Sequence, residues 1–246
     1  MIEIRHLPFN PLATNCYIAF EESQKGCVIV DPGMCRPSEK SQILDMIRAE
    51  GLLPEAILLT HGHFDHVWGV AAILAEFPCP VYMNPADKGV LDLATGLIPR
   101  VAFRMGVEPF EWTAAPDGTV VEAGGARWKA IATPGHSPGG LCWWCEESRV
   151  LFTGDTLMAG TIGRSDLPEG DYDVLMESVL KKVMVLPGDT DVFPGHGGMT
   201  TIGREGMTNP FLDPFNEPEV PWGSGREPHP REETWAPGNR TGATPQ

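Results

Sequence analysis

The stretch THGHFDH at residues 60–66 follows an apolar run and places three histidines and one aspartate within six positions. His61 and His63 are two residues apart, so their side chains point the same way if the backbone there is extended. Asp65 and His66 then face a second point close by. This spacing predicts two halves of a metal site, which other parts of the chain can complete.

Three later apolar runs also end in a tight turn that carries a residue type known to bind metals. KAIATPG leads into His136, VLFTG into Asp155 and VFPG into His196. A glycine stands directly before each of these residues, where a strand must turn sharply and the backbone must come close. We therefore expect these side chains and those of residues 60–66 to meet at one edge of a sheet.

The seven residues together favour a metal centre over a set of unrelated core side chains. A single histidine beside an apolar run is usually a hydrogen-bonded core residue, and His6 and His229 are interpreted in that way. Five imidazoles and two carboxylates buried without a metal would leave many polar groups unsatisfied. This ligand set suits zinc, and also iron or manganese. It leaves room for solvent at each ion, as catalytic zinc sites require.

The apolar patterns predict a layered α/β fold. Helical patterns at 38–50, 66–77 and 171–186 separate short β-branched runs. The first helix is expected to start at Ser38, as its N-cap, and to stop at Gly51. The close spacing of the predicted strands 126–133, 140–145 and 149–154 implies that part of the sheet is antiparallel. The predicted strands are 27–31, 55–60, 80–83, 126–133, 140–145, 149–154 and 191–195.

The composition excludes several classes of protein. The chain has 246 residues, of which 42% are apolar, so it can fill a full-sized core. It carries 18 Lys and Arg against 33 Asp and Glu, which gives a formal net charge of −15. Nucleic acids and anionic membranes bind clustered Lys and Arg, so we expect neither as a partner.

The cysteines and the N-terminus favour a cytoplasmic protein with reduced thiols. Six cysteines lack the dense spacing of a disulfide framework. Cys142 and Cys145 in the CWWC run are interpreted as core residues, because side chains three apart in a strand point to opposite faces. The first ten residues lack a basic stretch followed by an apolar one.

Two parts of the chain differ in composition. Residues 1–212 hold the predicted strands, helices and ligands, and they are expected to form the catalytic domain. Residues 213–246 are rich in proline and glycine and have no apolar period, so they cannot build a core of their own. We expect either a flexible tail or an extended arm that docks on the body or on a neighbouring subunit, which would make a homo-oligomer.

Four motifs resemble those of the metallo-β-lactamase superfamily. They are THGHFDH at 60–66, TPGHSPG at 133–139, FTGDTL at 152–157 and PGH at 194–196. Within the superfamily, GDTLMAGTIGRSDLPEGD at 154–171 resembles the glyoxalase II-like branch, the hydroxyacylglutathione hydrolases and their short bacterial relatives. The resemblance covers about residues 1–212. It implies an αββα sandwich of two facing mixed sheets flanked by helices, with the site at one edge of the sheets.

The resemblance also implies a role for each of the seven residues, with two zinc ions as the cofactor and iron or manganese as alternatives. One ion would be bound by His61, His63 and His136, and a second by Asp65, His66 and His196, with Asp155 bridging them. Asp65 and Asp155 are the carboxylates expected to serve catalysis. A metal-bridging hydroxide would attack a carbonyl group of the substrate, so no serine or cysteine nucleophile is needed.

Three residues near the motifs are candidates for supporting roles. Asp31 is a candidate carboxylate for orienting a ligand histidine, with a plain turn residue as the alternative. Arg164 and Asp166 are expected to pair with each other or with backbone near the site.

The resemblance leaves the substrate class open. A small acyl thioester, of the S-lactoylglutathione type or broader, is expected first, and a lactone or other ester next. The alternative from another class is a persulfide dioxygenase of the same fold, with one iron bound by residues matching His61, His136 and Asp155. A periplasmic β-lactamase is disfavoured, because Asp155 stands where the common enzymes of that group use cysteine.

The C-terminal segment departs from the pattern of full-length glyoxalase II enzymes. Those enzymes carry a helical domain whose basic side chains hold the carboxylates of glutathione. Here the cations of the corresponding segment are Arg226, Arg231 and Arg240. An anionic glutathione conjugate therefore fits a chain of net charge −15 poorly, unless one of these arginines folds over the cleft.

Overall fold

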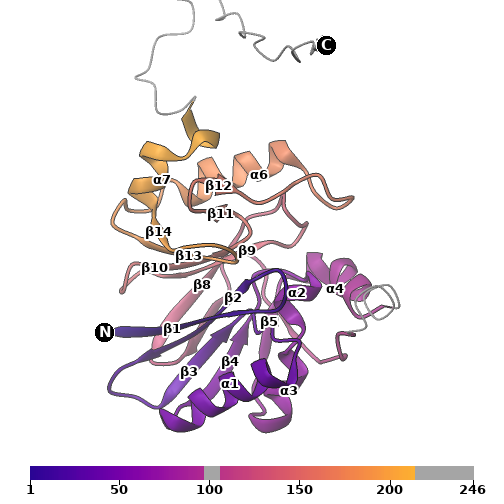
Figure 1. Cartoon of the computed structure of the whole chain (residues 1–246). Coiled ribbons are helices and arrows are strands. Elements are labelled where there is room, and N and C mark those ends of the chain that lie inside the picture. The colour runs from indigo at the N-terminus through magenta and orange to yellow at the C-terminus, as the bar shows by residue number, and fades with distance from the viewer. Residues whose placement is uncertain (97–105, 214–246) are drawn as a thin grey trace, which may run out of the picture. The chain divides into compact units, whose positions relative to one another are not determined.

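Two six-stranded sheets lie at the centre of the computed structural model, which describes residues 1–96 and 106–213 (Figure 1). The first sheet has the order β1 (Ile2–Phe9), β2 (Thr14–Glu21), β3 (Gly26–Val30), β4 (Leu53–Leu58), β5 (Val81–Met83), β6 (Thr113–Ala114). The second has the order β14 (Thr200–Thr201), β13 (Asp191–Pro194), β10 (Val150–Gly154), β9 (Leu141–Cys145), β8 (Ala126–Ala132), β7 (Val120–Ala123). Each sheet combines parallel and antiparallel pairs, as predicted for part of the sheet by the spacing of residues 126–154.

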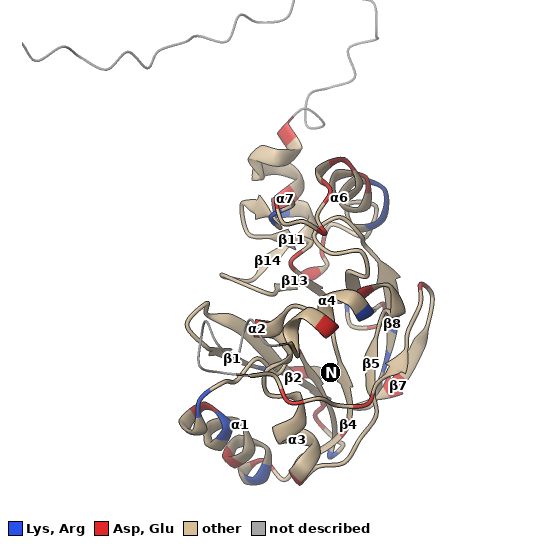
Figure 2. Cartoon of the chain, turned by 90° about the vertical axis from the view of Figure 1, so that its right-hand side faces the viewer, with Lys and Arg blue, Asp and Glu red and all other residues tan. Residues whose placement is uncertain are grey.

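Helices cover the outer face of each sheet, so the layers are helix, sheet, sheet, helix. Figure 2 shows α1 and α3 at one end of the molecule, α6 and α7 at the opposite end, and the strands between them. The helices are α1 (Pro37–Ala49), α2 (Phe64–Val67), α3 (Val70–Glu76), α4 (Lys88–Ala94), α6 (Tyr172–Ser178) and α7 (Ile202–Thr208). Short turns η1 (Pro85–Asp87), η2 (Val179–Val183) and η3 (Pro210–Leu212) and the hairpin β11 (Leu157–Met158) and β12 (Thr161–Ile162) complete the fold. The predicted αββα sandwich is confirmed.

Apolar side chains fill three layers of core. Between the sheets, Tyr17 contacts Phe152 with ring centroids 5.2 Å apart, and Phe152 contacts Trp128 at 5.4 Å. The other two layers lie between each sheet and its helices. Cys142 lies in the helix-facing layer and Cys145 between the sheets, which confirms their prediction as core residues on opposite faces. Burial of these apolar surfaces is the main driving force for the fold.

The predicted start of the first helix is wrong by two residues. Helix α1 begins at Pro37 with Arg36 as N-cap, rather than with Ser38. The carboxylate of Glu39 accepts the backbone N–H groups of Cys35 and Arg36 at 2.9 and 3.0 Å. The bond from the N–H of the N-cap residue Arg36 to Glu39 therefore stabilises the start of the helix without a serine cap. Gly51 at the other end has φ +65°, which confirms its predicted place just past the helix.

The single helix predicted for 66–77 is two helices, α2 and α3. The break lies at Trp68 and Gly69, because the Gly69 N–H donates to the Pro32 carbonyl at 2.7 Å. A bond to a distant loop therefore replaces one within the helix. The pattern at 171–186 likewise divides into α6 and the π-helical turn η2, and Asp171 caps α6 by accepting the Val174 N–H at 3.0 Å.

Other predictions concern membranes, location and the C-terminal arm. No helix in residues 1–96 or 106–213 is long and apolar enough to cross a bilayer. The predicted arm 213–246 lies outside the described residues, apart from Asp213, and so do His229 and the three arginines expected near the cleft. The domain boundary, the homo-oligomer and the cytoplasmic location remain predictions.

Candidate metal centre

The site lies at the edge where the two sheets meet, and four strands end there. β4 of the first sheet leads into residues 61–66, while β8, β10 and β13 of the second sheet lead into His136, Asp155 and His196. A backbone bridge between Thr14 and His196 joins the sheets at this point. The expectation from sequence, that turns at strand ends deliver the seven side chains to one place, matches this arrangement.

The first group contains His61, His63 and His136, whose rings surround one point. Their centroids are 4.7 to 4.9 Å apart, and the rings stand nearly perpendicular to one another. Nδ1 of His63 and Nε2 of His136 are 3.0 Å apart. One nitrogen of each residue lies within 4.8 Å of the others, so the three together can hold one metal ion.

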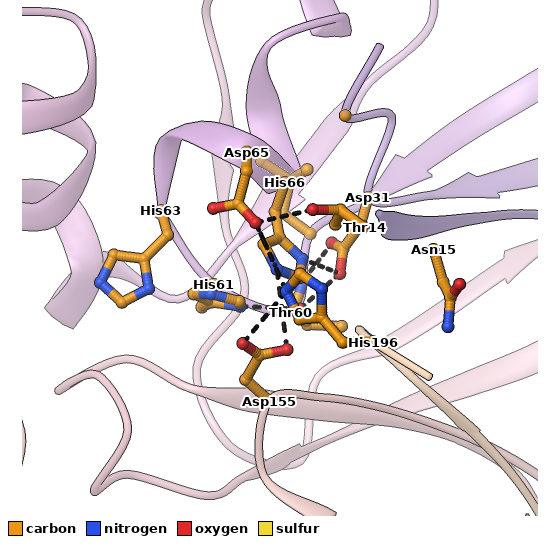
Figure 3. A network of polar contacts seen from close by, with 12 residues as sticks. Thr14, Asn15, Asp31, Thr60, His61, His63, Asp65, His66, Asp155 and His196 are labelled. Carbon is orange, nitrogen blue, oxygen red and sulfur yellow. Dashed lines mark hydrogen bonds and ion pairs between the residues drawn. The ribbon is translucent and has the colours of Figure 1, made fainter. Parts of the chain in front are cut away.

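The second group contains Asp65, His66 and His196. Oδ2 of Asp65 lies 3.5 Å from Nε2 of His66 and 3.4 Å from Nε2 of His196. Figure 3 shows these three side chains facing one another, with Asp155 directed toward them. This group offers two nitrogens and one carboxylate oxygen to a second ion.

Asp155 lies between the two groups. Its Oδ2 is 3.6 Å from Nε2 of His136, in the first group, and 3.5 Å from Nε2 of His196, in the second. Its Oδ1 is 3.7 Å from Nε2 of His66. A carboxylate in this position can contact two ions at once.

The outward nitrogen of every ligand histidine has a hydrogen-bond partner. The pairs are His61 Nδ1 with Thr60 Oγ1, His63 Nε2 with Glu169 Oε1, His66 Nδ1 with Asp31 Oδ2, His136 Nδ1 with the Arg164 carbonyl, and His196 Nδ1 with the Leu12 carbonyl. These bonds are 2.7 to 3.1 Å long. Such partners fix the ring orientation and leave the inward nitrogen as the metal-binding atom.

Three inward atoms fit a metal because nothing else satisfies them. His61 Nε2, His66 Nε2 and Asp155 Oδ1 are buried and have no hydrogen-bond partner in the part of the chain that the structure describes. An unpaired buried polar atom costs free energy, and such atoms are rare in folded proteins. Divalent cations bound at the centre would satisfy all three atoms.

Asp31 supports this centre from the end of β3. Its Oδ1 accepts the Thr60 N–H at 2.8 Å, and its Oδ2 accepts the Thr60 hydroxyl at 2.6 Å and contacts His66 Nδ1 at 2.8 Å. Asp31 has φ +48°, a conformation that few residues other than glycine adopt. The contact with a histidine of the motif, expected from sequence, is therefore present.

Burial and neighbouring charges shift the pKa values in opposite directions in the two groups. Burial, together with the adjacent imidazoles, lowers the pKa of His61 well below its usual value, and burial also lowers the pKa of His136. Burial opposes protonation of His66 as well, but the carboxylates of Asp65, Asp31 and Asp155 outweigh it and raise the pKa of His66 to about 10. In the metal-free protein His61 and His136 are therefore neutral at pH 7, whereas His66 is protonated.

The turn between β1 and β2 holds the second group, and sequence reasoning missed it. Thr14 donates its hydroxyl to Asp65 Oδ2 at 2.7 Å, and Asn10 donates its side-chain amide to the Asp65 carbonyl at 3.0 Å. Leu12 supplies the carbonyl that contacts His196. Asn10 and Ala13 have φ +58° and +53°, so this turn has a constrained shape. The turn-forming pair Asn10 and Pro11, followed by Thr14 and Asn15, was the available signal.

Glu169 was missed as well, although it lies within a stretch that was singled out. Its carboxylate contacts His63 at 3.1 Å, and its side chain is 21% exposed, so it stands at the mouth of the site. Arg164 and Asp166 pair with each other on the surface at 2.8 and 3.0 Å, as expected. His6 contacts Asn15 Oδ1 at 2.6 Å and belongs to neither group.

Comparisons with known proteins identify relatives of this chain. The family model described as Metallo-beta-lactamase superfamily matches residues 9–196 of this chain. Hydroxyacylglutathione hydrolase GloC of Haemophilus influenzae is 32% identical over 219 residues, which cover 86% of this chain and 99% of that protein.

Two solved structures are similar over nearly their whole length. BLEG-1 B3 metallo-beta-lactamase is 36% identical with a TM-score of 0.77, covering 85% of this chain and 99% of that one. TTHA1623, solved in a di-iron-bound form, is 36% identical with a TM-score of 0.73, covering 85% of this chain and 100% of that one. The names of these relatives state different activities, so they do not identify a single substrate.

Proposed function

The chain belongs to the metallo-beta-lactamase superfamily of metal-dependent hydrolases, and on that premise we propose that it hydrolyses small acyl thioesters with two bound metal ions. One observation carries the proposal. Two groups of three ligands converge on neighbouring points, and Asp155 lies within 3.7 Å of ligands from both. A binuclear centre uses both groups, whereas a mononuclear one would leave the second group without a purpose.

The ligand atoms follow from the hydrogen bonds on the outer side of each ring. One ion would be held by Nε2 of His61, Nδ1 of His63 and Nε2 of His136. The other would be held by Oδ2 of Asp65 and Nε2 of His66 and His196, with Asp155 shared between the two. Zinc suits this imidazole-rich set, and iron is the first alternative because TTHA1623 has been solved with two irons.

The bound ions would supply a Lewis acid for the carbonyl oxygen and lower the pKa of a water molecule. The chain's own part is to hold the ions and set their charge. Asp65 and Asp155 contribute two negative charges against roughly four positive charges on two divalent ions, which leaves an excess of about two positive charges. With both ions held by these residues, that excess would be available to stabilise a negative charge on the carbonyl oxygen of the substrate.

No protein nucleophile is needed beside this centre. Ser137 follows His136 directly, but it is fully buried and donates its hydroxyl to Asp87 at 2.8 Å. Its oxygen is therefore engaged in holding the loop and cannot reach a substrate.

Charge at the mouth of the site favours a thioester whose carrier has few carboxylates. Glu169 stands beside His63, and the whole chain has a formal net charge of −15. Both repel an anionic carrier such as glutathione. We therefore expect neutral or cationic carriers to be used better than S-lactoylglutathione, with lactones and other esters as the next class.

A substrate panel on protein of known metal content tests the proposal. It contains S-lactoylglutathione, a neutral acyl thioester, a lactone, a β-lactam and glutathione persulfide, with thiol release and oxygen uptake as readouts. We expect two ions per chain, thiol release from the neutral thioester, and loss of both metal and turnover in Asp155→Ala. One iron per chain with oxygen uptake on the persulfide would contradict the proposal, and so would full turnover by the variant.

A further inference from the structure

A buried carboxylate outside the ligand set, Asp87, contacts both loops of the first ligand group. We propose that Asp87 is a positioning residue, which sets the geometry of the first metal site by tying the loop of His61 and His63 to the loop of His136. This inference rests on the proposed function, because it assumes that these histidines bind an ion. Asp87 does not reach the centre itself and acts through the backbone of its neighbours.

Three hydrogen bonds connect Asp87 to the two loops. It is the last residue of the turn η1, which follows β5, and its side chain has no solvent exposure. Oδ2 accepts the N–H of Gly62, between the two histidines, at 2.8 Å. It also accepts the Ser137 hydroxyl at 2.8 Å, while Oδ1 accepts the Gly139 N–H at 2.5 Å. One carboxylate thus joins a loop of the first sheet to a loop of the second.

The two loops need this tie because they come from different sheets. A backbone bond from the Leu141 N–H to the Thr60 carbonyl, 2.7 Å long, joins them at the base of the site. Asp87 adds a connection on the ligand side, next to His63 on one loop and His136 on the other. The angle between the three imidazoles then depends on this carboxylate.

Two glycines allow the loops to approach Asp87 so closely. A Cβ atom on Gly62 would lie 3.1 Å from the Asp87 carbonyl oxygen and from the Leu91 nitrogen. A Cβ atom on Gly139 would lie 2.5 Å from the Asp87 nitrogen, which no real side chain tolerates. The absence of a side chain at Gly62 and Gly139 is therefore explained by close packing of the two loops against η1 and α4, rather than by contact with a ligand.

Asp87→Asn is the informative change, since the amide keeps the size of the carboxylate. It replaces one acceptor oxygen by a donor where three donors converge, so at least one bond to a loop is lost. Loss of a partner behind the ligands typically weakens metal binding about 10- to 100-fold. We expect a loss of that size in one of the two metal-binding steps.

Glu205 provides a matched control. It is equally buried and accepts bonds from Thr200, Gly160 and Asn209, none of which is a predicted ligand or the neighbour of one. Glu205→Gln removes the same charge from a comparable network. It should lower the melting temperature of the metal-free protein while leaving both metal affinities within about twofold of wild type.

The test titrates metal-free wild type, Asp87→Asn and Glu205→Gln with cobalt(II) and zinc against a competing chelator. Visible absorption of bound cobalt reports the ligand geometry, and melting temperature without metal reports folding. We expect weaker binding and altered absorption bands in Asp87→Asn and in neither other protein. If Asp87→Asn does not fold, Ser137→Ala removes one of the three bonds and should weaken binding in the same direction to a smaller extent.

Each outcome separates the inference from the proposed function. Unchanged affinity and absorption in Asp87→Asn would overturn the inference, as would an equal loss in Glu205→Gln. If Asp87→Asn does not fold, unchanged affinity in Ser137→Ala would overturn it. A wild type that binds no metal would instead overturn the proposed function.

Discussion

His66 carries a proton in the metal-free protein, so an ion in the second group must displace it. The carboxylates of Asp65, Asp31 and Asp155 raise the pKa of His66 to about 10, and the pKa of His196 is raised as well. The pKa values of His61 and His136 in the first group are lowered, so these rings are already neutral. Changing the pH is therefore expected to affect the two ions differently.

The magnitude follows from competition between one proton and one ion. With a pKa of about 10, the neutral form of His66 is about one part in a thousand at pH 7 and one in a hundred at pH 8. His66 alone should therefore make the apparent affinity for the second ion rise about tenfold for each pH unit in this range. His61 and His136 add no such dependence to the first ion at these pH values.

Calorimetric titration with zinc in buffers of different ionisation enthalpy counts the protons released in each step. Asp31→Asn is the comparison, because it removes one carboxylate that keeps His66 protonated. A proton lost from bound water is common to both proteins, so the difference between them reports His66. We expect fewer protons released in the second step of the variant at pH 8. Identical proton release in the two proteins, or equal pH dependence of both ions, would refute the reasoning.

Three further predictions follow from the same contacts. Thr14→Val removes the hydroxyl that donates to Asp65 and should lower the affinity for the second ion about tenfold. The control Thr119→Val removes a surface hydrogen bond to Pro116 and should leave that affinity unchanged. Equal affinities of the two variants in a metal titration would contradict this prediction. With metal kept saturating, because Glu169 also contacts the ligand His63, Glu169→Gln should lower KM for S-lactoylglutathione about two- to fivefold relative to KM for a neutral thioester. One charge near the site contributes on the order of 0.5–1 kcal/mol; an equal change in both KM values would count against the prediction. Removing metal with a chelator should lower the melting temperature by roughly 8–16 °C, since about 4 kcal/mol of stabilisation is lost when metal was present at a thousand times its Kd; an unchanged melting curve would argue against buried ligands.

The candidate site could be predicted from sequence because its ligand residues directly follow strands. His61, His136, Asp155 and His196 each follow an apolar run and a sharp turn. Their positions after predicted strands were therefore enough to predict that they lie at one edge of a sheet. The residues behind the ligands could not be found in this way. Thr14 is 51 positions from Asp65, so no local pattern connects them.

The fold was predictable where local preference and tertiary packing agree. The strands around Val30 and Phe152 are fully buried, and their continuous apolar runs identified them. β1 and β2 were not predicted. β1 is exposed or half-buried over much of its length, so its pattern is weak, whereas β2 is buried over seven of its eight residues and its apolar run at 16–20 was overlooked. The break at Gly69 depends on the hydrogen bond from its N–H to the Pro32 carbonyl, which is a tertiary contact. The start of α1 depends on the hydrogen bonds from the Cys35 and Arg36 N–H groups to the Glu39 carboxylate, which replaces the usual cap.

The central claim is that two ions are held by the two ligand groups and share Asp155. Anomalous X-ray diffraction from a crystal of the metal-loaded protein, measured at the absorption edge of the bound metal, tests it most directly. The account predicts two peaks about 3.5–4 Å apart. One should lie among His61, His63 and His136, and the other among Asp65, His66 and His196, with Asp155 contacting both. A single peak, or a pair in which Asp155 contacts neither ion, would contradict the account.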